Sequence, residues 1–224
     1  MRLIAINGGP RKRWNTATLL KAALEGAEEA GAETELIHLY DVRYTGCISC
    51  FVCKQKRDTP VLRCALQDEL SPVLDKVMAS DALIIGSPIY LGNVTGQTRS
   101  FLERLVFMNL SYDHAENPFK GHISAAFFFT MNVPADVAKK IYTPMFESNV
   151  QLLGRLGGST EYLTSCDTYQ FDDYSKYAAG RFDESHKAKV RAEQFPRDRQ
   201  RAFEIGKKLV LREDASVLKA ASAV

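Results

Sequence analysis

Apolar and polar positions alternate in blocks along this chain, and the blocks predict strands and helices in turn. Three short runs have the apolar, β-branched or aromatic content of buried strands, at residues 3–6, 82–86 and 124–130. The third run lacks a polar face, which favours the centre of a sheet. Two weaker runs, 35–39 and 160–164, bring the predicted strands to five.

Helical spacing of apolar positions follows most of these runs. It predicts helices over 19–27 with Gly31 as the stop, over 70–78 with Pro72 in the first turn, from about Thr95 to Val106, over 136–155 with a kink or break at Pro144, and over 196–211. Residues 41–66 and 166–195 show no clear period, so both are predicted to be irregular.

The alternation of strands and helices predicts a doubly wound α/β fold. Its five-stranded parallel sheet has the order 2-1-3-4-5, with helices on both faces. We expect one domain over residues 1–212, interrupted by a cysteine-rich insert at about 44–66. Residues 213–224 are rich in Ala and Ser and are predicted to be a frayed tail.

Composition narrows the class of protein. Hydrophobic residues make up 46% and charged residues 25% of the 224 positions, as in ordinary globular proteins. The net charge of +2 gives no reason to expect a nucleic-acid or membrane partner. The apolar runs are too short to span a bilayer, and the amino terminus lacks a signal-peptide layout. We therefore expect a cytoplasmic protein.

The loop after the first strand, residues 7–16, has the ingredients of a phosphate site. Gly8 and Gly9 let the backbone approach a ligand, and Asn15 and Thr16 open a helix whose free amides attract anions. The neighbouring Arg11-Lys12 pair adds positive charge. The loop is neither a G-x-G-x-x-G fingerprint nor a P-loop, which argues against Rossmann-type NAD and against ATP. The alternative is an ordinary turn that uses the same residue types.

The loop at 86–96 follows the third strand and faces the first loop in a sheet of this order. Pro88 and Tyr90 form a flat, partly apolar wall, while Ser87, Asn93 and backbone amides can address ring heteroatoms. A flat aromatic cofactor with a phosphate tail fits between the two loops. The alternative is a structural loop with a buried tyrosine.

Four of the five cysteines lie within eighteen residues, at Cys47, Cys50, Cys53 and Cys64. In a reducing compartment such a group indicates metal or redox chemistry. The C-x-x-C-x-x-C run suits three thiolates of a [4Fe–4S] cluster, with Cys64 as the fourth. A zinc site, a redox disulfide and reduced cysteines without a cofactor are the alternatives.

These motifs together resemble the flavodoxin-like NAD(P)H-dependent FMN reductase superfamily, and within it the iron–sulfur flavoprotein branch. The first loop matches G-S-P-R-x-x-x-N-T, except that Gly9 replaces serine and so removes one donor. The second loop matches G-S-P-x-Y, followed by Thr95-Gly96 and the pair Glu103-Arg104. The C-x-x-C-x-x-C run also matches, but ten residues separate Cys53 from Cys64, a longer gap than in iron–sulfur flavoproteins.

The resemblance implies that FMN binds at the carboxyl edge of the sheet and carries the chemistry, so that no catalytic side chain is required. The expected FMN-contacting residues are Gly9, Pro10, Arg11, Lys12, Asn15, Thr16, Ala17, Ser87, Pro88, Ile89, Tyr90, Leu91, Asn93, Thr130, Met131 and Asn132. The expected metal ligands are Cys47, Cys50, Cys53 and Cys64.

The function this implies is an FMN-dependent oxidoreductase or electron-transfer flavoprotein. It would pass electrons from NAD(P)H, a transient donor, or from a reduced carrier to a quinone, a flavin or a redox protein, through a [4Fe–4S] cluster if the cysteines hold one. Family resemblance also implies a homodimer or homotetramer. The rival hypothesis is a non-enzymatic flavodoxin-like module that binds metal through its cysteines and serves a regulatory or interaction role.

Overall fold

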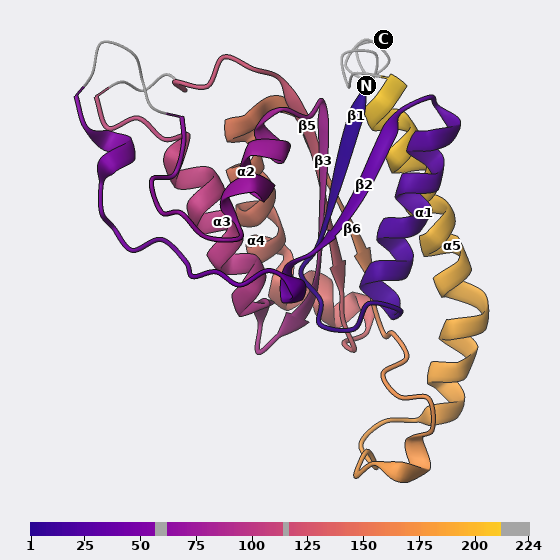
Figure 1. The fold of residues 1–224 in the computed structure, drawn as a ribbon. Helices are drawn as coiled ribbons and strands as arrows, with labels where there is room; N and C mark the ends of the chain where they lie inside the picture. Colours follow the sequence, from indigo (N-terminus) through magenta and orange to yellow (C-terminus); the bar gives the residue numbers. More distant parts are fainter. Residues whose placement is uncertain (57–61, 114–116, 212–224) are drawn as a thin grey trace, which may run out of the picture.

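The computed structural model describes residues 1–56, 62–113 and 117–211. The predicted tail at 213–224 and residues 57–61 of the predicted insert lie outside this part. One sheet organises the chain (Figure 1). Its strands are β1 (Arg2–Asn7), β2 (Glu33–His38), β3 (Ala82–Tyr90), β4 (Asn93–Val94), β5 (Ile123–Thr130) and β6 (Gly157–Ser165).

The five long strands are parallel and lie in the order β2-β1-β3-β5-β6, which confirms the predicted topology. The predicted count of five omits the sixth strand, β4, which pairs antiparallel with the end of β3. Leu91 and Gly92 make the two-residue turn between them, both at positive φ (49° and 85°). A two-residue turn of this kind usually carries Asn-Gly or Asp-Gly. Because Leu91 stands at the first position, the sequence gives no signal for the turn or for β4.

Helices cover both faces of the sheet, as predicted. The helix α1 (Asn15–Glu29) and the carboxy-terminal α5 (Glu184–Leu211) lie side by side on one face. On the other face lie α2 (Ser71–Met78), α3 (Gly96–Met108) and α4 (Ala135–Leu153) (Figure 1). Each face buries its own apolar cluster, since alternate residues of the strands point to opposite sides. Short 3₁₀ helices occur at η1 (Leu39–Asp41), η2 (Val52–Lys54), η3 (Gly154–Leu156) and η4 (Tyr174–Lys176).

Two glycines set the close approach of α1 and α5. A Cβ built on Gly206 would lie 1.8 Å from the Ala23 carbonyl oxygen, and one on Gly26 would lie 2.0 Å from that of Phe203. Either side chain would drive the two backbones apart, so both positions need glycine. This contact holds α5 against the helix that begins at the predicted phosphate loop.

The last helix, α5, begins at Glu184, twelve residues before the predicted start at Pro196. The prediction that residues 184–195 are irregular is therefore wrong. This half of α5 is mostly exposed and has no apolar stripe, so the periodicity test fails on it. Its Lys, Glu, Ala, Arg and Gln content favours a helix by propensity alone. Pro144 likewise lies inside a continuous helix, α4.

The cysteine-bearing segment leaves the sheet after η1 and extends beyond α2 and α3 (Figure 1). Three contacts fasten it along α3: the hydroxyl of Tyr44 donates to the carbonyl oxygen of Gln97 at 2.6 Å, Arg104 bonds to Leu66, and Lys54 donates to Leu110 at 2.6 Å. The Lys54 ammonium sits at the carboxyl end of α3, where the helix dipole favours a cation. No helix in the described ranges is long and apolar enough to cross a bilayer.

Candidate functional site

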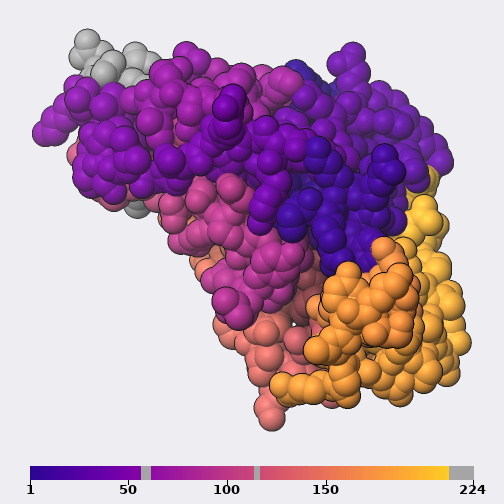
Figure 2. All heavy atoms as spheres, turned by 60° about the horizontal axis from the view of Figure 1, so that its bottom comes forward, coloured from indigo at the N-terminus to yellow at the C-terminus, as the bar shows by residue number. Residues whose placement is uncertain are grey.

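A pocket opens at the carboxyl edge of the sheet, where the loops after β1, β3, β5 and β6 meet. Figure 2 looks onto this edge of the sheet. The indigo loop at residues 7–16, the predicted phosphate loop, lies beside the orange segment that follows β6. The pocket encloses about 540 Å³ of empty space, a figure that includes the space at its open, solvent-facing side. It is lined by Gly9, Pro10, Arg11, Trp14, Asn15, Thr16, Pro88, Ile89, Tyr90, Thr130, Met131, Asn132, Thr168 and Gln170.

The backbone of the phosphate loop is held from both sides at Gly8. Its amide donates to the carbonyl oxygen of Gly86 at 2.8 Å, and its own carbonyl oxygen accepts from Thr95 Oγ1 at 2.7 Å. A Cβ at Gly8 would lie 1.8 Å from Thr98 Oγ1, so this position requires glycine. The loop after β1 is therefore joined to β3 and to the first turn of α3.

The next residue, Gly9, forms the floor of the pocket with the start of α1. Its amide donates to Asn7 Oδ1 at 3.0 Å. A Cβ here would meet Asn7 Oδ1 and Pro88 Cδ at 3.2 Å, close but not forbidding. Asn15 and Thr16 open α1 and line the pocket, and first-turn amides of a helix have no intrahelical acceptor. This cradle suits an anionic group.

The segment after β6 closes over the phosphate loop. The carbonyl oxygen of Tyr169 accepts from Trp14 Nε1 at 3.1 Å and from Asn15 Nδ2 at 2.9 Å. The carbonyl oxygen of Gln170 accepts from Arg11 at 2.6 Å, and that guanidinium also stacks over Trp14, 4.6 Å from the ring centroid. Side chains of the loop are thus held by backbone carbonyls from the other end of the chain.

A buried ion pair holds this closing segment in place. Lys187, 3% exposed, contacts the Asp167 carboxylate and donates to the Asn132 carbonyl oxygen at 2.9 Å. His186 Nε2 lies 2.5 Å from the other carboxylate oxygen of Asp167. Asp167 takes a positive φ of 53°, which reverses the chain after β6. The ammonium of Lys187 therefore joins the loop after β5 to the loop after β6.

One buried polar atom of a pocket-lining residue has no hydrogen-bond partner among the described residues. Asn132 Oδ1 is buried and accepts no hydrogen bond from any described residue. A buried acceptor without a donor is costly, so a ligand that donates a hydrogen bond at this point would be favoured. The orphaned acceptor, the apolar faces of Pro88 and Ile89, and the anion cradle together fit a flat ring that carries a phosphate.

Eleven of the predicted FMN-contacting residues line the pocket, and five do not. The five outside the lining are Lys12, Ala17, Ser87, Leu91 and Asn93. Lys12 forms an ion pair with Asp41 at 2.7 Å, and the hydroxyl of Ser87 is already bonded to Pro88 O and Thr95 N. Leu91 is fully exposed at the tip of the β3–β4 turn.

Sequence reasoning did not place Trp14, Thr168 and Gln170 in the site. Trp14 belongs to the phosphate loop but carried no recognised motif, and the other two follow β6 in a stretch without periodicity. The aromatic residues nearby pack on one another, with ring centroids 4.9 Å apart for Tyr169 and Tyr174 and 4.1 Å apart for Phe171 and Tyr177.

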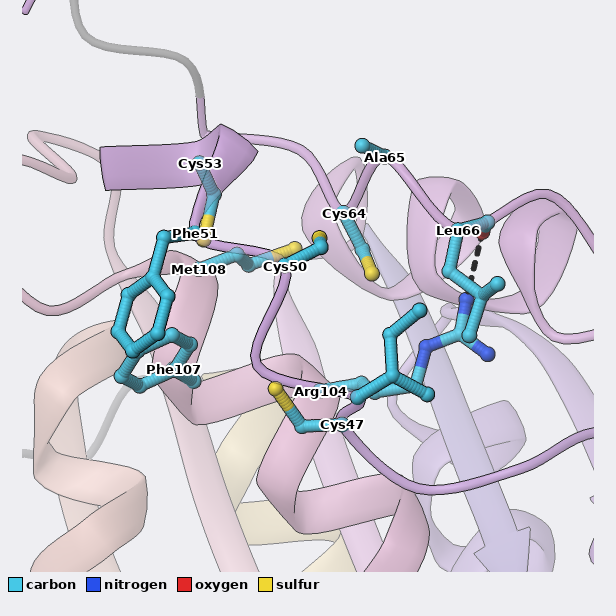
Figure 3. A pocket seen from close by; sticks show the side chains of 11 residues that line it. Cys47, Cys50, Phe51, Cys53, Cys64, Ala65, Leu66, Arg104, Phe107 and Met108 are labelled. Carbon is cyan, nitrogen blue, oxygen red and sulfur yellow. Dashed lines mark hydrogen bonds between the residues drawn. The ribbon is translucent and has the colours of Figure 1, made fainter. Parts of the chain in front are cut away.

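The four clustered cysteines line a second pocket, together with Ile48, Phe51, Ala65, Leu66, Arg104, Phe107 and Met108. Figure 3 shows their side chains around one space, with Phe51 and Phe107 on one side and Arg104 on another. All five cysteines are free thiols. Among the described residues, no three metal-ligating side chains converge as they would around a single ion.

Burial raises the pKa of the Cys53 thiol, and the neighbouring thiols of Cys64, Cys47 and Cys50 add to that rise, while Lys54 opposes it. Cys166 lies elsewhere, after β6, and burial raises the pKa of its thiol to about 11.

The backbone around the cysteines is unusual. Ser49 and Phe51, on either side of Cys50, both take positive φ values (53° and 55°). Residues other than glycine persist in this region only where their surroundings enforce it, and such positions concentrate at functional sites. The loop is thus held in a strained path that winds the thiols around the pocket.

The fold and the carboxyl-edge pocket define a flavodoxin-like α/β protein. The chain belongs to the NADPH-dependent FMN reductase family, which matches residues 1–137. This confirms the predicted resemblance. Among curated proteins, it is 41% identical over 104 residues to an iron-sulfur flavoprotein of Archaeoglobus fulgidus, covering 46% of this chain and 48% of the relative. It is 36% identical over 104 residues to one of Methanocaldococcus jannaschii, covering 46% and 51%. The chain thus spans about half the length of these relatives.

Solved structures agree on the fold. A NAD(P)H:quinone oxidoreductase from Methanothermobacter marburgensis matches with a TM-score of 0.62 at 17% identity, over 93% of this chain and 96% of the other. An azoreductase from Bacillus anthracis matches with a TM-score of 0.61 at 13% identity, over 93% and 99%. At such low identity, the likeness establishes the architecture alone.

Proposed function

We propose that this chain is an FMN-dependent oxidoreductase that binds FMN in the carboxyl-edge pocket and passes electrons onward. The observation that carries the proposal is the pocket itself. The pocket has an anion cradle at the start of α1 and a wall that includes Pro88 and Ile89. It also includes Asn132, whose buried Oδ1 has no donor among the described residues. Membership of the FMN reductase family supports the same ligand.

When bound, FMN supplies two-electron and one-electron chemistry that no side chain offers. The protein's part is to hold it. Asn15, Thr16 and the first amides of α1 would receive the phosphate, Pro88 and Tyr90 would face the ring, and Asn132 would accept from a ring N–H. The five predicted contacts outside the present lining, Lys12, Ala17, Ser87, Leu91 and Asn93, stay predictions.

Titration with FMN and with riboflavin tests the site. The cradle predicts that FMN binds at least tenfold more tightly than riboflavin, because only FMN carries the phosphate. Thr16→Val, which removes one pocket hydroxyl, should weaken FMN and leave riboflavin unchanged. Equal affinities for the two flavins would contradict the assignment of the cradle, and a purified protein that takes up no flavin would favour the non-enzymatic module.

We further propose that Cys47, Cys50, Cys53 and Cys64 hold a [4Fe–4S] cluster. The donor set fits, since four thiols line one pocket and, among the described residues, no carboxylate or imidazole lines it with them. The strained backbone at Ser49 and Phe51 and the iron–sulfur names of the relatives support it. A zinc site, a redox disulfide and bare thiols are the other outcomes of the test.

Anaerobic reconstitution with iron and sulfide separates these outcomes. Four irons and four sulfides per chain are expected of such a cluster, lost in Cys64→Ala but kept in the control Cys166→Ala, whose thiol lies outside the pocket. Stoichiometric zinc, or a disulfide by mass spectrometry, would contradict the cluster.

The donor, acceptor and assembly follow from the same proposal. We assign NAD(P)H or a reduced carrier as donor and a quinone, flavin or redox protein as acceptor, within a homodimer or homotetramer in the cytoplasm. Steady-state reduction with each nicotinamide, and sedimentation of the reconstituted protein, test these assignments.

A further inference from the structure

The cysteine pocket contains a fully buried arginine that the proposed ligand set leaves unused. Arg104 lies in the middle of α3, 1% exposed, and lines the pocket beside Cys64 (Figure 3). Arginine stays charged under all ordinary conditions and is almost never fully buried without partners. Each N–H donor of the buried guanidinium therefore needs an acceptor.

Two of the three guanidinium nitrogens are bonded to the chain that flanks the cysteines. One terminal nitrogen contacts the Asp68 carboxylate at 2.5 Å and the Thr45 carbonyl oxygen at 3.4 Å. The other donates to the Leu66 carbonyl oxygen at 2.8 Å. These contacts lie on both sides of the cysteine run, so Arg104 fastens its two ends to α3.

The third nitrogen, Nε, is different. It is buried and donates to no acceptor in the described part of the chain. A buried N–H without an acceptor costs free energy, and it costs more on a charged group. The Cys64 thiol lies beside the guanidinium and interacts with Arg104, but Nε itself has no hydrogen-bond partner among the described residues. The pocket thus presents an unused cationic donor to whatever its four thiols hold.

We propose that Arg104 Nε donates a hydrogen bond to a sulfur of the cysteine-held cluster and thereby raises its reduction potential. This inference rests on the proposed [4Fe–4S] site. Thiolate and sulfide sulfurs accept such bonds, and their number is one of the protein's main influences on cluster potential. Reduction adds negative charge, so a buried cationic donor stabilises the reduced form more than the oxidised form. Arg104 acts here as a hydrogen-bond donor to the cluster and is distinct from its four ligands.

The decisive variant is Arg104→Lys. Lysine keeps the positive charge and can still meet Asp68, but it lacks the Nε donor of the planar fork. Arg104→Gln removes the charge as well. The matched control is Arg99→Gln, which removes the same charge from the same helix at a side chain that is 54% exposed and pairs with Glu103 at 3.6 Å. Solvent screens this exposed charge from the pocket.

The measurement is the midpoint potential of the reconstituted holoprotein, obtained by reductive titration and followed by electron paramagnetic resonance. Arg104→Lys is expected to disfavour reduction at least tenfold in equilibrium constant, a shift of about 59 mV to more negative potential for one electron. Arg104→Gln should shift further in the same direction, and Arg99→Gln should match the wild type. FMN content and its own potential report whether each variant is folded.

The results separate this inference from the proposed function. A wild-type protein that takes up no iron and sulfide overturns the cluster and this inference with it. A loaded Arg104→Lys protein with the wild-type potential overturns the role of Nε alone and leaves the cluster standing. If Arg104→Gln fails to load, Arg104→Lys still decides the matter, because it retains the charge and a partner for Asp68.

Discussion

Thr95 Oγ1 donates a hydrogen bond to the carbonyl oxygen of Gly8 at 2.7 Å and accepts one from the Thr98 amide at 3.2 Å. One buried hydroxyl therefore caps α3 and ties it to the phosphate loop. Because α3 also carries Arg104, the same helix is in contact with both pockets. Its amino end supports the carboxyl-edge pocket, and its middle and carboxyl end support the cysteine pocket.

Replacing Thr95 with valine should weaken this junction. The change removes a helix cap and leaves the Gly8 carbonyl oxygen buried without its donor, so we expect the free energy of unfolding to fall by about 1–3 kcal/mol. FMN affinity should fall as well. Chemical denaturation and flavin titration measure the two effects. Thr143→Val is the control, since its exposed hydroxyl donates to the carbonyl oxygen of Lys139 within α4; an equal loss there would contradict the role given to Thr95.

Gly9 is the point where the loop after β1 departs from the G-S-P-R pattern expected of the family. Gly9→Ser adds a donor beside the cradle, and a Cβ here meets neighbours at 3.2 Å, which a small adjustment can relieve. We expect FMN to bind about 3- to 10-fold more tightly, the value of one added hydrogen bond. Gly9→Ala carries the same Cβ without the hydroxyl. An equal gain in Gly9→Ala would show that the hydroxyl has no part in it.

We expect the buried Lys187–Asp167 ion pair to stabilise the fold only while both partners are present, because either charge alone is costly to bury. Lys187→Met leaves the Asp167 carboxylate without its ammonium partner, so we expect a loss of about 3–5 kcal/mol in the free energy of unfolding. The double variant Lys187→Met/Asp167→Asn should recover much of this loss, because no unpaired charge remains. A double-mutant cycle gives the coupling energy, and strictly additive losses would contradict it.

Glu35 provides a prediction for acid stability. The hydrogen bond from Lys76 holds the pKa of Glu35 below its usual 4.5, with a further contribution from Arg2 and partial opposition from burial. A lowered folded-state pKa contributes stability that is complete above about 4.5 and is lost as the pH falls through the folded value. Glu35→Gln should therefore destabilise the protein at neutral pH and make the remaining acid transition shallower.

Measuring unfolding free energy between neutral pH and about pH 3 tests this prediction. The exposed Glu193→Gln change on α5 controls for the loss of one carboxylate. If both variants followed the wild-type curve, the Glu35 ion pairs would have no part in acid stability.

The sheet was predictable because its signal is local. The apolar runs at β1, β3 and β5 mark buried strands by themselves, and their alternation with helices implies the strand order. The loops that face the pocket follow from that order, which explains why Pro88 and Thr130 were correctly expected at the same edge of the sheet.

What sequence reading missed depends on contacts between distant residues. Trp14 bonds to Tyr169, and Arg11 bonds to Gln170, because the chain after β6 folds back over the first loop. The Glu103-Arg104 pair is a recognisable motif, but the sequence does not show that Arg104 is fully buried. An arginine inside the protein and one on its surface cannot be told apart from the sequence alone. The first half of α5 is mostly exposed and packs few side chains against the sheet. It therefore has no apolar stripe by which the sequence could have indicated a helix.

The closing segment at 167–170 lies beyond residues 1–137, the part that the family shares with this chain. One wall of the pocket is therefore supplied by residues outside the matched region, whereas the cradle beneath it lies inside that region. Replacing the side chains of this segment would therefore change the wall of the pocket and leave the residues of the cradle in place.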